Sequence, residues 1–399
     1  MSSDAVLPAP AQWVGFAAGL ALALSTWLSV IGTLIVPRPI NSRISKLSGR
    51  TAIAVFAAMR RPLRTYPARD RLLAWQAPMA LLLRLVLWIA LLDVAYAFML
   101  LPFVRGRLAS AFDESGSSLF TLGYSAPTHS GSTTLVYIAA FSGLVVVGLQ
   151  IGYLPTLYAA FNRREEEVTL LVARGGLPAW GPELLARTRF GLGTLDGSGE
   201  LADLYRTWER WAADVAETHS TYLTLCWLRS PRPYSNWLIS MISVMDAAAL
   251  HLSLTPSTAP TLRARLVVRS GISCMQQIAG AIGLPVVDDA DPNESITLTF
   301  DEFAAAVDML QAVGFSVEVS AEQAWPHFRG WRVNYERMAY ALARSIDAPP
   351  AMWSGPRRWP SHPVPPHRPA NRVARETARD DPQSMPRTID APVPQPPTD

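Results

Sequence analysis

The stretch of this chain with the clearest chemical potential is Thr121-Leu122-Gly123-Tyr124-Ser125, a short polar loop between two long apolar segments. It offers hydroxyl groups, backbone carbonyls and, at Gly123, unusual backbone freedom. Irregular backbone at membrane depth persists only where it is packed in protein or lines a water-filled cavity. The chemistry open to this loop is therefore that of polar backbone atoms facing a cavity.

Elsewhere the sequence offers no pattern typical of an enzyme. No nucleophile with a base, no pair of carboxylates and no phosphate loop occurs at a legible spacing. His219 and His251 have no Cys or His at the spacing of metal ligands. A glycine run at 191–199 lacks the spacing and the preceding strand of a nucleotide-binding turn. We expect no enzyme activity, no cofactor, no metal site and no nucleic-acid partner.

The elements that must position the loop are membrane helices. Of the 399 residues, 50% are hydrophobic and only 17% are charged, which favours a membrane protein. Residues 13–36 and 131–161 are uncharged, and residues 77–103 are interrupted only by Arg84 and Asp93. Each run exceeds the roughly 20 residues that cross a bilayer. The sequence predicts three transmembrane helices.

The basic residues predict the orientation of these helices, because Lys and Arg resist translocation. The first twelve residues contain no Lys or Arg, whereas residues 37–76 contain nine: Arg38, Arg43, Lys46, Arg50, Arg60, Arg61, Arg64, Arg69 and Arg71. Residues 1–12 are therefore expected outside the plasma membrane and residues 37–76 in the cytoplasm. Within this basic loop, the apolar segment 51–59 is suited to lying against anionic lipids of the inner leaflet.

Residues 77–161 resemble the pore domain of potassium channels, and the overall layout resembles actinobacterial channel-like membrane proteins. The resemblance rests on Thr121 to Ser125 between two spans, after a helix-length segment at 108–120. It implies that residues 104–130 form a pore helix and selectivity filter between an outer helix at 77–103 and an inner helix at 131–161. It also implies a homotetramer that conducts K⁺, because four copies of the loop are needed to close a ring of carbonyls.

Two positions depart from the potassium-channel pattern. Ser125, followed by Ala126, stands where the family has a glycine followed by an aspartate, and serine does not adopt a positive φ cheaply. Ser117 stands where the family has a glutamate behind the filter. We expect relaxed selectivity, with Na⁺ as a second permeant ion. Two alternatives stay open: an ordinary turn between packed helices, and a non-conducting scaffold or sensor that presents its cytoplasmic domain to partners.

The predicted third span carries candidate gating residues. Gly148 and Gly152 precede Pro155, which is expected to kink the helix as a hinge or gate. Gln150 is a candidate for lining the cavity. In the second span, Asp93 is expected either to hydrogen-bond a neighbouring pore element or to pack in protonated form against Tyr96.

Three acidic residues follow the third span: Glu165, Glu166 and Glu167. Repeated around a tetramer, they would concentrate cations at the inner mouth of the pore. The alternative is an ordinary charged segment at the membrane surface.

Residues 162–350 read as a mainly helical cytoplasmic domain with an unknown ligand or protein partner. Apolar residues at helical spacing predict a long packed helix through Leu201, Leu204, Trp208, Trp211, Val215, Tyr222 and Cys226. The apolar run 236–254 contains Asp246 and His251, which favours a buried bundle helix over a fourth span. Further helices are expected at 261–282, 300–313 and 321–345, with short strands near 295–299 and 315–319 left open. Residues 351–399 contain 12 prolines and predict a disordered tail.

Taken together, these patterns predict an all-α membrane protein of three transmembrane helices, with a re-entrant loop between the second and third and a helical cytoplasmic domain. The predicted function is passive cation transport by a homotetramer.

Overall fold

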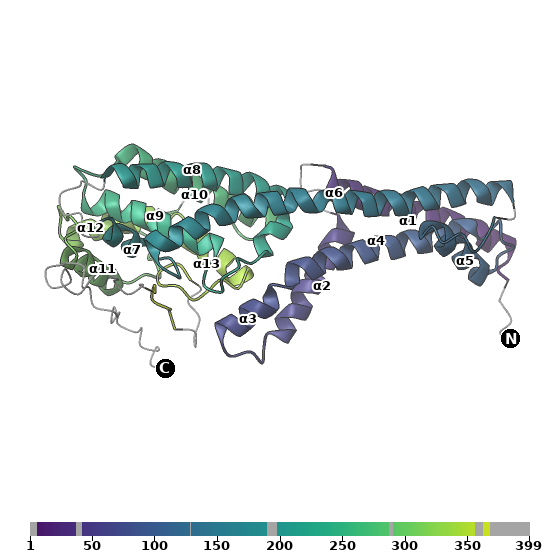
Figure 1. Ribbon diagram of the computed structural model, residues 1–399, viewed down its shortest axis with the longest axis horizontal. Coiled ribbons are helices and arrows are strands. Elements are labelled where there is room, and N and C mark those ends of the chain that lie inside the picture. The colour runs from purple at the N-terminus through teal and green to yellow at the C-terminus, as the bar shows by residue number, and fades with distance from the viewer. Residues whose placement is uncertain are drawn as a thin grey trace, which may run out of the picture. The chain divides into compact units, whose positions relative to one another are not determined.

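The structure is a computed structural model that describes residues 6–36, 42–127, 129–189, 198–286, 290–355 and 362–367. Within these ranges the chain is helical and has no strand, which confirms the predicted all-α class for this part of the molecule. The chain divides into two compact units (Figure 1). Unit 1 comprises residues 1–64 and 71–159, and unit 2 comprises residues 65–70 and 160–399.

Unit 1 is built from α1 (Ala9–Leu34), α2 (Arg43–Met59), α4 (Gln76–Leu100), α5 (Leu108–Leu119) and the first part of α6 (Ser130–Gly175). Small residues let α1 approach α4 closely: a Cβ atom on Gly19 would lie 2.5 Å from the carbonyl oxygen of Ala95. Nearby, the indole N–H of Trp88 donates to the Ser29 hydroxyl at 3.0 Å. Backbone contact and a buried polar bond therefore fix this helix pair.

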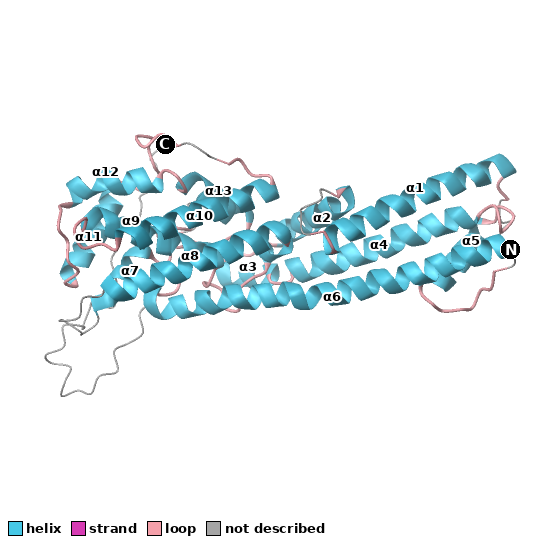
Figure 2. Ribbon diagram, turned by 90° about the horizontal axis from the view of Figure 1, so that it is seen from above, coloured by secondary structure: helices cyan, strands magenta, loops and turns pink. Residues whose placement is uncertain are grey.

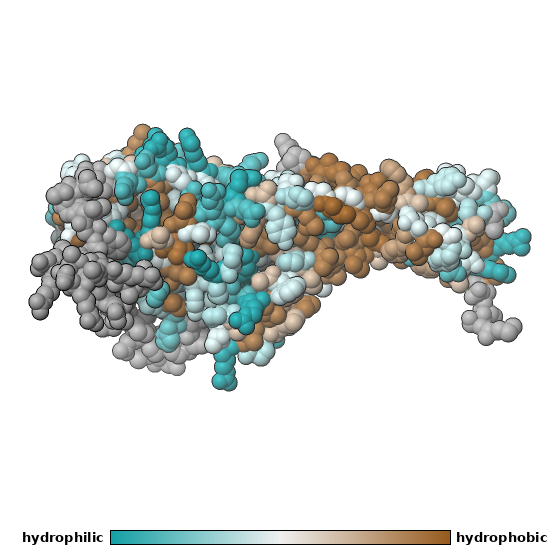
Figure 3. All heavy atoms as spheres, viewed as in Figure 1, coloured by the Kyte–Doolittle hydropathy of each residue, from teal (hydrophilic) through white to brown (hydrophobic). Residues whose placement is uncertain are grey.

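Four helical stretches are long and apolar enough to cross a membrane: α1, residues 66–100, α6 and α9 (Trp237–Leu254). Hydrophobic residues gather over α1, α4 and α6 in Figure 3. The most apolar window of α9 is 94% buried, whereas in the other three stretches the buried share is 28% to 39%. Most of the apolar surface of those three stretches therefore has no protein cover within this chain.

The predicted spans at 13–36, 77–103 and 131–161 fall on α1, α4 and α6, but α1 begins earlier, at Ala9, and α4 ends earlier, at Leu100. Helix α6 continues to Gly175, because the Arg and Glu residues that end the uncharged run are good helix formers, as are the Leu and Ala residues that follow them. The basic loop contains two helices, α2 and the eight-residue α3 (Tyr66–Leu73), where the sequence indicated only one short apolar segment.

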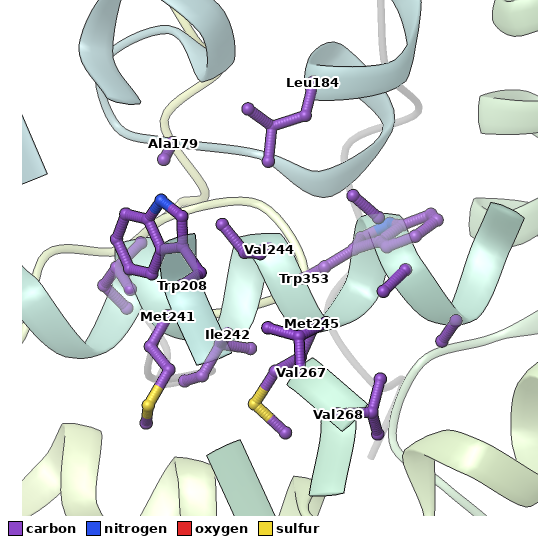
Figure 4. Packing of buried hydrophobic residues seen from close by; sticks show 14 of the residues in the cluster. Ala179, Leu184, Trp208, Met241, Ile242, Val244, Met245, Val267, Val268 and Trp353 are labelled. Atoms are coloured by element: carbon purple, nitrogen blue, oxygen red, sulfur yellow. The ribbon is translucent and has the colours of Figure 1, made fainter. Parts of the chain in front are cut away.

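Unit 2 is organised around α9, with α8 (Ser198–Thr221) and α10 (Thr261–Ile282) packed beside it. Figure 4 shows Met241, Ile242, Val244 and Met245 of α9 among the side chains of neighbouring helices. The remaining elements are α7 (Gly181–Ala186), the 3₁₀ helices η1 (Arg187–Arg189) and η2 (Leu223–Trp227), α11 (Phe300–Ala312), α12 (Ala321–Arg332) and α13 (Glu336–Ser345). The structure thus buries the apolar run 236–254 as a central helix.

Other expectations for unit 2 need correction. Helix α8 ends at Thr221, so Tyr222 and Cys226 lie beyond it, in and beside η2. The expected helix at 321–345 is two helices with a break at 333–335. Residues 295–299 and 315–319, both described, form no strand. Figure 2 likewise shows helices and loops without strands in the described chain.

The folded unit also extends past residue 350. Trp353 is 2% exposed, and its backbone carbonyl accepts hydrogen bonds from Arg332 and Tyr340. Residues 362–367 also pack within unit 2, where the His367 N–H donates to the Leu177 carbonyl at 3.1 Å. The beginning of the predicted disordered tail is therefore ordered, and residues 356–361 and 368–399 lie outside the described part.

Candidate functional site

The short helix α5 is fixed to α4 by a buried polar contact. The Ser115 hydroxyl lies 2.9 Å from the carbonyl oxygen of Asp93 and 2.8 Å from its Oδ1 atom. Gly116 lies beside the same carboxyl group, since a Cβ atom there would be 3.8 Å from Asp93 Oδ1. Of the two roles considered for Asp93, the structure places it against α5. Tyr96 instead bonds the Ser142 hydroxyl at 2.6 Å.

Helix α5 also lies against α6 at a glycine. A Cβ atom on Gly143 would be 2.0 Å from the carbonyl oxygen of Leu119, the last residue of α5. Only glycine allows backbone groups to approach so closely. Gly143 therefore acts as a contact point for the end of α5.

The candidate loop begins with a helix cap of the Schellman type. The Leu122 N–H donates to the Ser117 carbonyl at 2.8 Å, and the Thr121 N–H donates to the Ser118 carbonyl at 2.9 Å. This cap needs a left-handed residue, usually glycine, and Thr121 fills it with φ of 55°. A β-branched residue in that conformation is strained. Gly123 also has a positive φ, of 71°.

Ser117 holds both ends of the loop. Its carbonyl also accepts from the Gly123 N–H at 3.2 Å, and its hydroxyl accepts from the Ser125 N–H at 3.0 Å. Ser125 does not adopt a positive φ. The serine that replaces the expected glutamate therefore braces the loop through its own hydroxyl and carbonyl.

The backbone oxygens of the loop are left available. In the described part of the chain, no hydrogen bond reaches the carbonyls of residues 121–124. Leu122 and Tyr124 are 65% and 64% exposed, while Ser125 is half-buried. Chemically, the loop presents consecutive free carbonyl oxygens and one threonine hydroxyl, the donor set that suits a dehydrated monovalent cation.

Glu114 is a site residue that the sequence reasoning missed. It lies on α5, one turn before Ser117 and Ser118, and is only 3% exposed. Its carboxyl group faces Ser132 at the start of α6 and lies near His129, and its Oε1 atom is buried without a hydrogen-bond partner in the described chain. The signal was available, because residues three apart on a helix share a face. Glu114 therefore lies between α5 and the segment that leaves the loop.

Helix α6 is continuous through Pro155, and the hinge expected there stays a prediction. Gly148 and Gly152 are exposed, and a Cβ atom on either would meet nothing within 4 Å. Exposed residues follow alternating steps of four and three along one face: Tyr137, Phe141, Leu144, Gly148, Ile151, Pro155 and Tyr158. We call this face the α6 stripe.

Gln150 does not belong to the α6 stripe. It is 6% exposed, on the buried side of α6 within unit 1, whereas a cavity-lining side chain would be open in a single chain. Gln150 therefore does not lie at the cavity-lining position that the sequence suggested.

The three glutamates at 165–167 have different surroundings. Glu165 is buried and accepts from the Arg164 guanidinium at 2.7 Å, so its charge is compensated within unit 2. Glu166 is exposed and Glu167 half-buried. Only the last two are placed to meet ions in solution.

In the described residues, no group of three or more His, Cys, Asp or Glu side chains is placed to hold a metal ion. No protein-family model matches the chain, and no curated protein or solved structure matches it either.

Proposed function

We propose that the chain is one subunit of a homotetrameric cation channel in the plasma membrane, with three spans and a re-entrant loop. The observation that carries this proposal is the loop 121–124, whose carbonyls are free and whose backbone is pinned to α5 by Ser117. A loop held in this way keeps its oxygen atoms ready for an ion without reorganisation. K⁺ is the proposed main ion, and Na⁺ the second.

The strained Thr121 supports this proposal. Glycine would form the same helix cap without the cost of a left-handed threonine. Backbone strain of this kind concentrates at functional sites. The hydroxyl and carbonyl of Thr121 would form the innermost ion position, nearest the negative end of the α5 dipole.

The apolar surfaces of unit 1 support a membrane location and an assembly. The α6 stripe is open in one chain and follows the spacing by which helices pack against one another. In the proposed tetramer it faces neighbouring subunits and the pore. Because α9 is buried in unit 2, we assign α1, α4 and α6 as the three spans.

The proposed orientation puts residues 1–12 outside and unit 2 in the cytoplasm, because residues 37–76 are strongly basic. Helix α2 exposes Lys46, Leu47 and Arg50 within one sector of about 100° around its axis. Such a mixed face suits anionic lipids at the inner leaflet.

A non-conducting scaffold is the second candidate, and Ser125 favours it. Its N–H is tied to Ser117, and it lacks the positive φ of the glycine at this place in potassium channels. A loop closed in this manner would retain the architecture of a pore without passing ions.

Ion flux into liposomes that contain the full-length protein separates the two candidates. A channel predicts K⁺ flux that Gly123→Asp abolishes. The aspartate would be strained at the positive φ of this backbone position, and it would place a charge beside the carbonyls. Gly199→Asp is the matched control, since its Cβ atom would meet nothing within 4 Å and an acidic residue suits the first turn of α8.

Ser125→Gly gives the second comparison. In a channel it should raise the ratio of K⁺ to Na⁺ flux. A tetramer that passes no ions as wild type and as Ser125→Gly would support the scaffold. A protein that is monomeric in the membrane would contradict the proposal itself.

A further inference from the structure

The chain crosses from one unit to the other at three points, after residues 64, 70 and 159. The first two crossings lie at the two ends of a very short segment. Residues 65–70 belong to unit 2, although unit 1 residues flank them on both sides. These six residues contain the first turn of α3. Unit 2 is thus joined to unit 1 through α6 and also through the start of α3.

Arg229 makes the ionic contact that holds the short segment in unit 2, beside a ring contact of Tyr66. Nη1 of Arg229 donates to the Asp70 carboxylate at 2.7 Å and to the Tyr66 hydroxyl at 3.0 Å. The Tyr66 ring stacks on Tyr234 with centroids 5.5 Å apart. The side chains of Arg229 and Asp70 are only 7% and 10% exposed. This is an ion pair in a largely dry contact, where charge pairs are strongest.

Arg229 also donates hydrogen bonds to backbone groups of unit 2 that do not depend on the docking of α3. It donates to the carbonyls of Ile346 at 2.7 Å and Asp347 at 3.1 Å, just after α13. If α3 leaves, the guanidinium keeps these two bonds and gains water. The contact can therefore open without leaving a buried, wholly unpaired charge in unit 2.

Helix α3 is poorly suited to remain folded alone but well suited to transmit a displacement. Its eight residues form the N-terminal end of a helical stretch that continues to Leu100, so without docking they can fray as a helix end does. Only Ala74 and Trp75 separate it from α4, and helical bonds continue through them, from the Trp75 N–H to the Leu72 carbonyl and from the Met79 N–H to the Trp75 carbonyl.

We propose that α3 is a releasable tether. Its contact with Arg229 docks it on unit 2, and while it is docked it transmits movements of unit 2 to α4. The regulatory part of this inference rests on the proposed channel function, because α4 braces α5 through Asp93 and Ser115. Docked α3 passes a displacement of unit 2 to α4, and released α3 does not.

Hydrogen exchange of the full-length protein tests the tether without reference to ion flux. Asp70→Asn should raise exchange in residues 65–73 at least about tenfold, because it removes the charge that Arg229 holds. Arg229→Lys should give an intermediate rise, since an ammonium keeps the charge but loses the planar fork. Asp214→Asn is the matched control, because it breaks the exposed pair with Arg163 elsewhere in unit 2. It should leave residues 65–73 unchanged.

Unchanged exchange of residues 65–73 in Asp70→Asn would overturn the tether. So would an equal rise throughout α8, α9 and α10, because the contact would then be part of the core of unit 2. Ion flux is the separate arm. Flux that differs between wild type and Asp70→Asn supports the coupling, and equal flux with α3 released overturns it. If the wild type passes no ions while α3 exchange still rises, the channel function fails and the tether stands.

Discussion

The hydroxyl oxygen of Ser117 lies 3.0 Å from the backbone nitrogen of Ser125, so one side chain of α5 closes the loop that follows that helix. The bond spans eight residues and fixes the far end of the candidate ion site. From the resemblance to potassium channels we expected a glutamate behind this loop. The shorter Ser117 side chain stands there instead and contacts the loop directly.

Ser117→Ala should loosen the loop. The substitution leaves the Ser125 N–H without its partner, at a cost of about 1–3 kcal/mol for a buried group and less for a half-buried one. We expect faster hydrogen exchange in residues 120–127 and a lower ratio of K⁺ to Na⁺ flux. Ser118→Ala is the control, because the Ser118 hydroxyl bonds only Glu114 within the same helix. Equal effects of the two substitutions would refute the bracing role.

Thr121 should respond differently to two substitutions. Thr121→Gly should stabilise the helix cap by about 1 kcal/mol, because it removes a left-handed β-branched residue. It should also reduce ion flux, because the hydroxyl is lost. Thr121→Ser keeps the hydroxyl and should keep most of the flux. The thermal midpoint and the flux are measured on the same preparations, and a glycine variant with full flux would remove the hydroxyl from the ion site.

Gly143 and Gly148 provide a matched pair on one helix. Gly143→Ala should destabilise unit 1 by about 1–3 kcal/mol, because the methyl group would meet the Leu119 carbonyl. Gly148→Ala meets no atom of its own subunit, so for unit 1 of the separated subunit it should be neutral or stabilising by up to about 1 kcal/mol. Thermal unfolding followed by tryptophan fluorescence distinguishes them. A larger loss for Gly148→Ala would mean that the end of α5 is not packed as described.

The long apolar helices were predictable from sequence because length and hydrophobicity alone specify them. The buried role of α9 was also predictable, since Asp246 and His251 interrupt an otherwise apolar run. The end of α6 was not, because the uncharged run stops near residue 161 while the helix continues to Gly175.

Tertiary partners account for most of what the sequence left undetermined. In the sequence, Gly143 cannot be told apart from Gly148, five residues later. Only the structure shows that Gly143 packs against the Leu119 carbonyl while Gly148 has no neighbour within 4 Å of a Cβ position. Glu165 reads like Glu166 until Arg164 is seen to take its charge. Tyr66 and Asp70 stand one turn apart in a basic loop, but nothing local reveals that Arg229 lies 159 residues after Asp70 in sequence and bonds both.

Asp246 should be the most sensitive acidic residue of unit 2. Its Oδ1 atom accepts from Arg332 and from the Tyr335 hydroxyl, each at 2.6 Å, and both Asp246 and Arg332 are almost fully buried. Asp246→Ala should cost about 3–5 kcal/mol, because it removes one partner of a buried ion pair. Asp203→Asn, which breaks an exposed pair with Arg206, should change stability by less than about 0.5 kcal/mol. Chemical denaturation measures both, and similar losses would contradict the buried network.

His219 should make unit 2 sensitive to acid. Burial, together with the adjacent Arg164 guanidinium, holds the pKa of His219 well below its usual value. Arg164 Nη1 lies 3.1 Å from His219 Nε2, and the Thr218 hydroxyl lies 3.1 Å from Nδ1. Since a guanidinium only donates, the arrangement assigns the proton of the neutral ring to Nδ1.

The sign of the effect follows from which state takes up the proton. Below about pH 6.5 the unfolded chain protonates this histidine while the folded chain keeps it neutral, so stability is full above that pH and falls as the pH drops toward the folded pKa. Stability should therefore fall between about pH 6.5 and pH 5. His219→Gln should remove that part of the pH dependence, whereas the exposed His327→Gln should keep it. Thermal midpoints of the three proteins at both pH values provide the measurement, and an unchanged slope in His219→Gln would assign the acid sensitivity to other groups.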